Sequence, residues 1–246
     1  MLNSTCLFHQ LVFVFFLLLN PSVSPFSTPS PIPKAESESS IKEASDFFIS
    51  NYYPTSTPAL YDLSSTQFSS DYAPLLTKRT FPSSLYFSSS IGLICGQTCL
   101  LSNKLDDLIR PKKSLEIYNE KMSYLGPKQR REFKGKSIYN IIPNLLPEYT
   151  VTTLISNLII PPSFRRKGYA QNLLLQLESS SETDSMSLFV NSKNIPAISL
   201  YEKLGYVSAG KTEGNKEVYV KDDGEVGERD VEEVFMIKNF MKSGGI

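Results

Sequence analysis

The feature that most constrains the fold is a buried-strand signal that runs through a short basic turn into a helix signal. Val151–Ile160 (VTTLISNLII) is dense in β-branched residues and predicts a buried strand. Gln171–Glu178 (QNLLLQLE) has the spacing of an amphipathic helix. The turn between them contains three consecutive cations, Arg165, Arg166 and Lys167, followed by Gly168. This succession requires a sheet with a helix packed on it.

The basic turn is a candidate anion site. The first N–H groups of a helix have no intrahelical partner, and the helix dipole favours negative charge at that end. Gly168 would let the backbone approach a ligand closely, and the three cations add positive charge. A solvated basic turn at the end of a strand fits the same residues equally well. On this passage alone, both interpretations stay open.

A second passage makes the interpretation more specific. Phe189–Val207 reads FVNSKNIPAISLYEKLGYV. Taken together, the two passages resemble the GNAT superfamily of N-acetyltransferases, whose acceptor loop Arg/Gln-x-x-Gly-x-Gly/Ala is matched by Arg165, Gly168 and Ala170. Further matches are Ile160, Pro162 and Phe164 before the loop, Asn194, Ala197, Tyr201, Glu202, Lys203, Gly205 and Tyr206 after it, and Val234–Lys238 near the end. The resemblance is closest to plastid-type and cyanobacterial-like members.

The resemblance implies both a fold and an activity. The fold is a GNAT-like acyl-CoA N-acyltransferase fold of the α/β class, with a central, mostly antiparallel mixed sheet and helices on both faces. The activity is transfer of the acetyl group of acetyl-CoA to a primary amine. The favoured acceptor is a protein N-terminal α-amine or a lysine. The alternatives are a small-molecule amine, such as a polyamine or an amino acid, and a non-catalytic acetyl-CoA-binding module.

The resemblance also implies roles for particular residues. Leu158, Ile159 and Ile160 would offer backbone groups to the pantetheine arm, as if it were an added strand. Asn194 would hydrogen-bond the cofactor near its pantetheine, and Tyr201 would protonate the leaving thiolate. By position alone, Tyr201 also fits a core tyrosine on an amphipathic helix. The pyrophosphate loop would comprise Arg165, Arg166, Lys167, Gly168, Tyr169, Ala170 and Gln171.

The general base is not evident. Some relatives carry a glutamate on the strand before the Asn, but here that stretch is Leu188–Val190. The remaining candidates are Glu148, or a water ordered by Ser156 or Asn157. An α-amine, with a pKa near 8, needs less help than a lysine. The missing base therefore favours α-amines or a water-mediated relay.

The charged segment 103–144 is interpreted as an insertion. A helical stretch is expected around Ser114–Tyr124, broken at Gly126-Pro127. Lys128–Lys136 (KQRREFKGK) could serve as a nucleic-acid or nuclear-import patch. Because the chain has no net charge and a pI of about 6.6, a solvated loop near the acceptor side is favoured, and no nucleic-acid partner is expected.

The remaining elements follow from periodicity and turn residues. A helix over Ile41–Tyr52 is expected to end at Pro54 and Pro58, with irregular structure over Tyr53–Ser84. The expected strands are Ser84–Leu101 with a turn near Ser88–Ser90, Met186–Val190, Tyr206–Lys211, Lys216–Lys221 and Val231–Phe240, and a further helix spans Pro196–Leu204.

Residues 1–40 are interpreted as a targeting presequence that is removed, which leaves a domain over residues 41–242. Leu11–Leu19 is an uninterrupted run of nine apolar residues, too short to span a membrane and suited to a signal peptide. The Pro- and Ser-rich stretch that follows, with Phe26, resembles the bipartite presequences of algae with complex plastids. Plain secretion is the alternative. No stable membrane insertion is expected after removal.

The three cysteines predict neither a metal site nor a disulfide. A structural zinc site takes about four ligands, and the sole histidine, His9, stands near the N-terminus with Cys6. Cys95 and Cys99 lie four apart on an expected strand, where they would share a face yet sit too far apart to bridge. Two buried thiols are expected.

Overall fold

The computed structural model describes residues 31–53, 57–76, 80–102, 108–109 and 111–240. The chain divides into two compact units, Met1–Pro31 and Ile32–Ile246, and the fold reported below is that of the second. The expected signal segment, with Cys6, His9 and Phe26, lies outside the described residues. Within the described part, no helix is long and apolar enough to cross a membrane.

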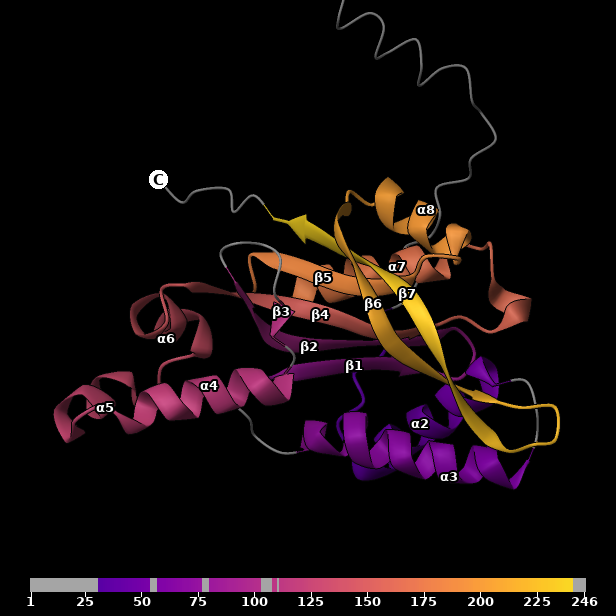
Figure 1. Ribbon diagram of the computed structural model, residues 1–246, viewed down its shortest axis with the longest axis horizontal. Coiled ribbons are helices and arrows are strands. Elements are labelled where there is room, and N and C mark those ends of the chain that lie inside the picture. The colour runs from indigo at the N-terminus through magenta and orange to yellow at the C-terminus, as the bar shows by residue number, and fades with distance from the viewer. Residues whose placement is uncertain (1–30, 54–56, 77–79, 103–107, 110, 241–246) are drawn as a thin grey trace, which may run out of the picture. The chain divides into compact units, whose positions relative to one another are not determined.

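A single mixed sheet forms the centre of the second unit, with strand order β1-β2-β4-β5-β7-β6 and with β3 paired to β2 (Figure 1). The β4–β5 pair is parallel, and the other pairs are antiparallel. The predicted mixed and mostly antiparallel sheet is therefore confirmed. The strands are β1 Ser83–Ser88, β2 Gly92–Ser102, β3 Leu108–Ile109, β4 Tyr149–Ile159, β5 Ser185–Asn191, β6 Val207–Val220 and β7 Val226–Asn239.

Helices cover both faces of this sheet, as the sequence predicts. Side chains alternate along β1, so Leu85 and Phe87 pack in one cluster with α2 (Glu38–Tyr52). Tyr86, between them, packs in the opposite cluster with α7 (Tyr169–Ser180). The helix α8 (Ile195–Lys203) contributes to the same cluster as α7. Each face of the sheet is therefore buried by its own set of helices.

A glycine in β2 fixes how closely α7 approaches the sheet. A Cβ built on Gly96 would lie 2.8 Å from Leu177 Cδ1 and 3.0 Å from Thr153 Cγ2. Only glycine leaves room for this contact, and Leu177 itself is 2% exposed. The contact between Gly96 and Leu177 therefore holds α7 close against β2. This position of α7 determines where its first residues lie relative to the end of β4.

The expectation of irregular structure over Tyr53–Ser84 is wrong. Pro58 begins α3 (Pro58–Gln67), a π-helical turn follows at Phe68–Tyr72, and a 3₁₀ turn follows at Ala73–Leu76. Proline at the first helical position loses no hydrogen bond, so it starts this helix rather than only ending the previous one. Packing then decides the rest, because Tyr72 is fully buried against α2.

The described part of the insertion holds three helices, α4 (Pro111–Ser123), α5 (Pro127–Phe133) and α6 (Ile138–Leu145). The expected helix around Ser114 and its break at Gly126 are confirmed. Lys128–Lys136 was expected to be a loop, but α5 forms over its first part. The amphipathic α6 buries Ile138, Ile141, Ile142 and Leu145. This burial anchors the insertion to Leu100 and Val151 on the sheet.

Two strands expected at Tyr206–Lys211 and Lys216–Lys221 are one continuous strand, β6. The pairing of β6 with β7 shifts register between Ser208 and Gly210 and again between Thr212 and Asn215. Gly214, with φ +78°, lies in the second irregularity. The turn residues that suggested a break are accommodated as bulges within a pairing that continues on both sides.

Residues 32–40 pack within the second unit, although they were predicted to belong to the presequence. The Ile32 N–H donates to Gln176 Oε1 at 2.9 Å, and Gln176 Nε2 donates back to the Ile32 carbonyl at 2.6 Å. The Ala35 N–H donates to the Leu85 carbonyl at 2.8 Å. Ser37 caps α2 through a capping box. This stretch therefore joins α7, β1 and α2.

Both expected thiols are confirmed. Cys95 and Cys99 are both buried and form no disulfide with each other. Burial raises the pKa of the Cys95 thiol to about 12.

Candidate functional site

The sheet opens between β4 and β5. The two strands pair over Thr153–Ile155 and Met186–Leu188 only. Beyond that point β4 continues to Ile159 beside β2, and β5 continues to Asn191 beside β7. In the described structure the facing edges of β4 and β5 therefore have no strand partner past Ile155. An unpaired strand edge is a template for an extended ligand.

A bulge in β4 accompanies the opening. Ser156 pairs with Cys95 but Ile159 pairs with Leu93, so β4 carries one extra residue there. Asn157 takes a φ of 54°, a left-handed conformation that asparagine adopts more readily than most residues. Bulges bend the strand that carries them. This bend marks the place where β4 parts from β5.

The loop after β4 is organised by a backbone contact and an aromatic pair. Arg165 Nε donates to the Ile160 carbonyl at 3.0 Å. The rings of Phe164 and Tyr169 meet edge to face at 6.0 Å, and Lys167 Nζ lies 5.4 Å from the Phe164 ring centroid. The structure thus brings the expected loop residues together directly after the end of β4.

The start of α7 has the features expected of an anion site. Its N-cap is Gly168, in the left-handed conformation, and no side chain caps it. The first intrahelical bond runs from the Asn172 N–H to the Gly168 carbonyl at 3.0 Å, so the amides of residues 169–171 have no intrahelical acceptor. A Cβ at Gly168 would meet no heavy atom within 4 Å. The space in front of these amides is open.

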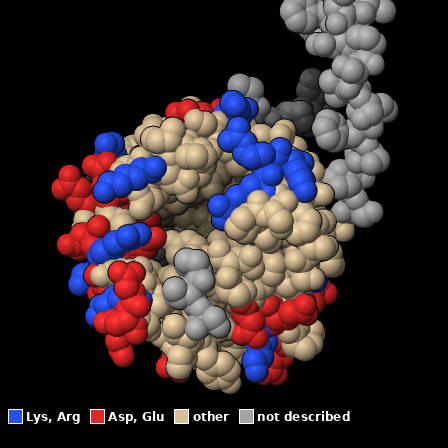
Figure 2. Space-filling view, turned by 90° about the vertical axis from the view of Figure 1, so that its right-hand side faces the viewer, with Lys and Arg blue, Asp and Glu red and all other residues tan. Residues whose placement is uncertain are grey.

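Positive charge borders a hollow on this side of the molecule. Arg165, Arg166 and Lys167 are all exposed. Figure 2 shows a group of Lys and Arg side chains beside a hollow, with mixed positive and negative charges on its other side. An anionic group entering here would meet cations and open amides together.

Tyr201 lies in the protein interior on α8, where it is 8% exposed. It packs in one cluster with Leu158 and Ile160 from the end of β4. Burial raises the pKa of its hydroxyl to about 12. The phenol is therefore protonated throughout the physiological pH range and can act as a proton donor, but not as a base.

Asn194 is the N-cap of α8, a role that the sequence reading did not identify. Its Oδ1 accepts a hydrogen bond from the Ala197 N–H at 3.3 Å. Because the contact uses the oxygen, the Asn194 amide nitrogen is left to serve as a donor. The implied contact between Asn194 and the cofactor stays a prediction.

The candidates for a general base, Glu148 and a water held by Ser156 or Asn157, differ in their distance from the opening. Glu148 precedes the first residue of β4, whereas the opening starts after Ile155. At about 3.3 Å per residue, Glu148 lies too far along the strand to act there, so this suggestion is wrong. Ser156 Oγ is buried and has no hydrogen-bond partner among the described residues. A water held by Ser156 or Asn157 stays a prediction.

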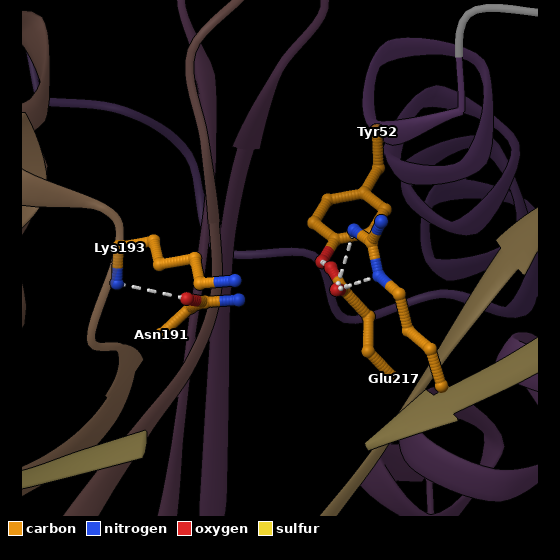
Figure 3. A network of polar contacts seen from close by, with 5 residues as sticks. Tyr52, Asn191, Lys193 and Glu217 are labelled. Carbon is orange, nitrogen blue, oxygen red and sulfur yellow. Dashed lines mark hydrogen bonds and ion pairs between the residues drawn. The ribbon is translucent and has the colours of Figure 1, made fainter. Parts of the chain in front are cut away.

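A polar network links the last residue of α2 to β6. Nothing in the sequence pattern had indicated it. The Tyr52 hydroxyl donates to Glu217 Oε1 at 2.6 Å, and Arg229 Nε and Nη2 donate to Glu217 Oε2 at 2.9 and 2.8 Å. Figure 3 shows this network across from Asn191, the last residue of β5, and Lys193, two residues further along the chain. The Lys193 N–H donates to Asn191 Oδ1 at 2.9 Å.

The network keeps Glu217 ionised. Burial alone would raise the pKa of this carboxyl, but hydrogen bonds from Tyr52 and Arg229 and the charge of Arg229 lower it below its usual value. The sequence signal for this site was weak. Tyr52 looked like a helix-face residue, and Glu217 is one of many charges on a long strand.

Comparison with known families supports the resemblance for the segment that carries the site. Residues 140–214 match the family model described as FR47-like protein, a GNAT-type model. The match covers under a third of the chain, and it contains the Arg165–Gln171 loop, Asn194 and Tyr201. The GNAT resemblance of this segment is therefore confirmed. No curated protein sequence matches the chain.

Solved structures with similar folds include Arabidopsis thaliana NAA60 in complex with acetyl-CoA (14% identity, TM-score 0.46, covering 85% of this chain and 97% of that one). The ribosomal-protein-S18-alanine N-acetyltransferase from Escherichia coli has 13% identity and a TM-score of 0.44, covering 87% and 95%. The putative acetyltransferase yncA from Salmonella typhimurium, with its cofactor acetyl-CoA, has 14% identity and a TM-score of 0.41, covering 88% and 98%. Because these TM-scores are below 0.5, the functional argument rests on this chain's own residues.

Proposed function

We propose that this chain is an acetyl-CoA-dependent N-acetyltransferase whose acceptor is a protein N-terminal α-amine or a lysine. One observation carries the proposal. The opening between β4 and β5 leads directly to the uncapped and basic start of α7. An extended arm and a pyrophosphate are the two parts of acetyl-CoA that such an arrangement fits.

The residues present suit each part of the donor. The amides of residues 169–171 and the cations Arg165–Lys167 would hold the pyrophosphate. The free edge of β4 at Leu158–Ile160 would pair with the amide groups of the pantetheine arm. Gly168 keeps the space before the amides clear of any Cβ. Side-chain identity at Leu158–Ile160 matters little, because pairing there uses backbone atoms.

The chemistry needs a proton donor for the departing sulfur. The acceptor nitrogen attacks the thioester carbonyl, a C–N bond forms, and the C–S bond breaks as its electron pair moves to sulfur. Tyr201 donates its proton to that thiolate, and the proton released by the amine passes to a base or to water. The raised pKa of Tyr201 keeps this proton in place before the reaction.

The acceptor would enter on the side of the Tyr52–Glu217 network. The Arg229 guanidinium balances the charge of Glu217 through two hydrogen bonds, so this network would offer an entering amine hydrogen-bond acceptors rather than net negative charge. Among the described residues no side chain stands out as a strong base, which favours an acceptor that loses its own proton near pH 8, as an α-amine does.

The test is a thiol-release assay on the full chain. Acetyl-CoA is incubated with a peptide library that presents free N-termini and lysines, and separately with a panel of polyamines and amino acids. Release of thiol with peptides, and acetyl-peptide by mass spectrometry, is the expected result. Release with small amines alone would contradict the acceptor class, and no release with any amine would contradict the activity.

We further propose that, if the presequence is removed, the cut precedes Ile32. Ile32 and Gln176 exchange two hydrogen bonds, and Ile32 is 6% exposed, so a cut after residue 32 would leave Gln176 unpaired. N-terminal sequencing of the chain recovered from cells tests this, and a mature terminus at residue 41 would contradict it. Fractionation of a tagged full chain would separate a plastid from a secretory destination.

A further inference from the structure

A cavity lies at the other end of the sheet from the α7 loop. Its volume is about 640 Å³, and its walls come mainly from α4, α5, the turn after α5, and α6. These helices stand beside the beginning of β4, whereas the α7 loop follows its end (Figure 1). Four cations of the stretch Lys128–Lys136 line this cavity, and the expected closeness of that stretch to the acceptor stays a prediction. The cavity has no part in the proposed acetyl transfer.

The floor of this cavity is apolar. Tyr118 and Met122 from α4, Phe133 from α5 and Ile138 from α6 line it. All four belong to the hydrophobic cluster that anchors the insertion to the sheet, so they are held in place from behind. A cavity of this volume with an aromatic and aliphatic floor is of the size that takes small organic molecules.

The rim of the cavity is basic. Arg130, Arg131, Lys134 and Lys136 line it, and Glu182 is the one acidic residue that does so among the described residues. The described structure gives none of the four cations an ion pair. The chain as a whole has no net charge, so this excess of positive charge is local. It cannot be ascribed to a generally basic surface.

Two of these cations are already held by neighbours and two are not. Arg130 Nη2 donates to the Ser123 carbonyl at 2.7 Å, and Lys136 Nζ lies 5.9 Å from the Phe133 ring centroid. Arg131 and Lys134 are exposed and, in the described structure, take part in no hydrogen bond through their side chains. These two are the groups left to bind an anion at the cavity mouth.

We propose that this cavity binds a small organic anion with an apolar body, such as a medium-chain carboxylate. Its head group is held by Arg131 and Lys134, and its body lies on Tyr118, Met122 and Phe133. The positive charge of the rim favours an anionic head group, because a cationic one would be repelled by the four Lys and Arg side chains there. The apolar floor disfavours a bare inorganic anion, because such an ion would leave the apolar side chains of the floor exposed to water. This inference is independent of the proposed acetyl transfer.

The test measures binding of decanoate to the full chain by calorimetry, below the concentration at which decanoate forms micelles. Saturable binding of one decanoate per chain is expected. Arg131→Glu and Lys134→Glu should each weaken it about tenfold or more, the loss of one charge-assisted hydrogen bond. Lys128→Glu is the matched control, since Lys128 is an exposed cation of α5 that does not line the cavity. It should change the affinity less than about twofold.

Further arms separate the proposal from its competitors. Decyltrimethylammonium binding as tightly as decanoate would overturn the charge selection. Inorganic phosphate, or an acidic peptide, binding as tightly and with the same sensitivity to Lys134→Glu would show a charged surface rather than a pocket. If acetyl-CoA displaced decanoate, decanoate would be bound in the acetyl-transfer site, and the proposal would be overturned. The absence of saturable decanoate binding would overturn it as well.

Discussion

The two helices that border the candidate site begin in opposite ways. The start of α7 is left open, with Gly168 as its N-cap, no capping side chain and three neighbouring cations. The start of α8 is closed, because Asn194 accepts a hydrogen bond from the Ala197 N–H and Pro196 removes another donor. An open helix start has amides to offer a ligand, whereas a capped one has used them for its own stability. We therefore infer that α7 contributes through its backbone and α8 through a side chain, Tyr201.

The largest effect should come from removing that side-chain function. Tyr201→Phe should lower kcat by about 100-fold or more, because a positioned general acid contributes on this order. The KM for acetyl-CoA should change little, since the open start of α7 is intact. Steady-state kinetics with a peptide acceptor measure both. An unchanged kcat would refute the role of Tyr201 as the acid.

A substitution that obstructs the open start of α7 should weaken the binding of acetyl-CoA rather than lower kcat. Gly168→Ala should raise the KM for acetyl-CoA about tenfold, because a Cβ would project into the space before the open amides. Gly135→Ala is the matched control. Gly135 has φ +79° against +82° for Gly168, and a Cβ on either would meet no atom within 4 Å. Both variants carry the same backbone strain, so equal KM values in the two would contradict a phosphate site at Gly168.

The pH profile should be shaped by the acceptor rather than by Tyr201. kcat/KM for an α-amine acceptor should rise several-fold between about pH 7 and pH 9, as the amine loses its proton near pH 8. Tyr201 must stay protonated to act as an acid, and burial raises its pKa to about 12, so no fall should appear below that pH. A decline between about pH 9 and pH 10 would contradict the assignment of a tyrosine with a raised pKa.

The smallest effect concerns the closed start of α8. Asn194→Ala should lower the free energy of unfolding by about 1 kcal/mol through the lost cap. Asn194→Asp keeps the capping oxygen and should preserve stability, which chemical denaturation can measure. The second variant also tests the cofactor contact, because it replaces the amide donor by a carboxylate that cannot donate. A raised KM for acetyl-CoA in Asn194→Asp would show that Asn194 has both roles.

Much of this site could be predicted because its signals are local. The strand before Ile160, the basic turn and the helix after Gly168 are contiguous, and each is specified by side-chain periodicity or by backbone freedom. The closing passage around Tyr201 is likewise one short helix followed by a strand. Local propensity and pattern therefore placed the strand and both helices that carry the proposed donor site where the structure has them.

Other parts could not be predicted because they depend on partners far away in the sequence. Glu217 is one charge among many on β6, and only its contacts with Tyr52 and Arg229 distinguish it. Glu148 directly precedes β4 in the sequence, yet the length of an extended strand separates it from the opening beyond Ile155. Two adjacent strands were expected where one bulged strand exists, because a turn signal does not reveal that pairing with β7 continues.

By itself, the sequence determined that a buried strand, a basic glycine-containing turn and a helix follow one another, with Tyr201 on the next helix. The tertiary structure decided which backbone groups remain free, because β4 and β5 pair over only three residue positions before they part. It also decided that Arg130, Arg131, Lys134 and Lys136 border a separate cavity beside α4 and α6. Residue type fixes what a group can donate or accept, but only packing fixes which groups stay unpartnered and what they face.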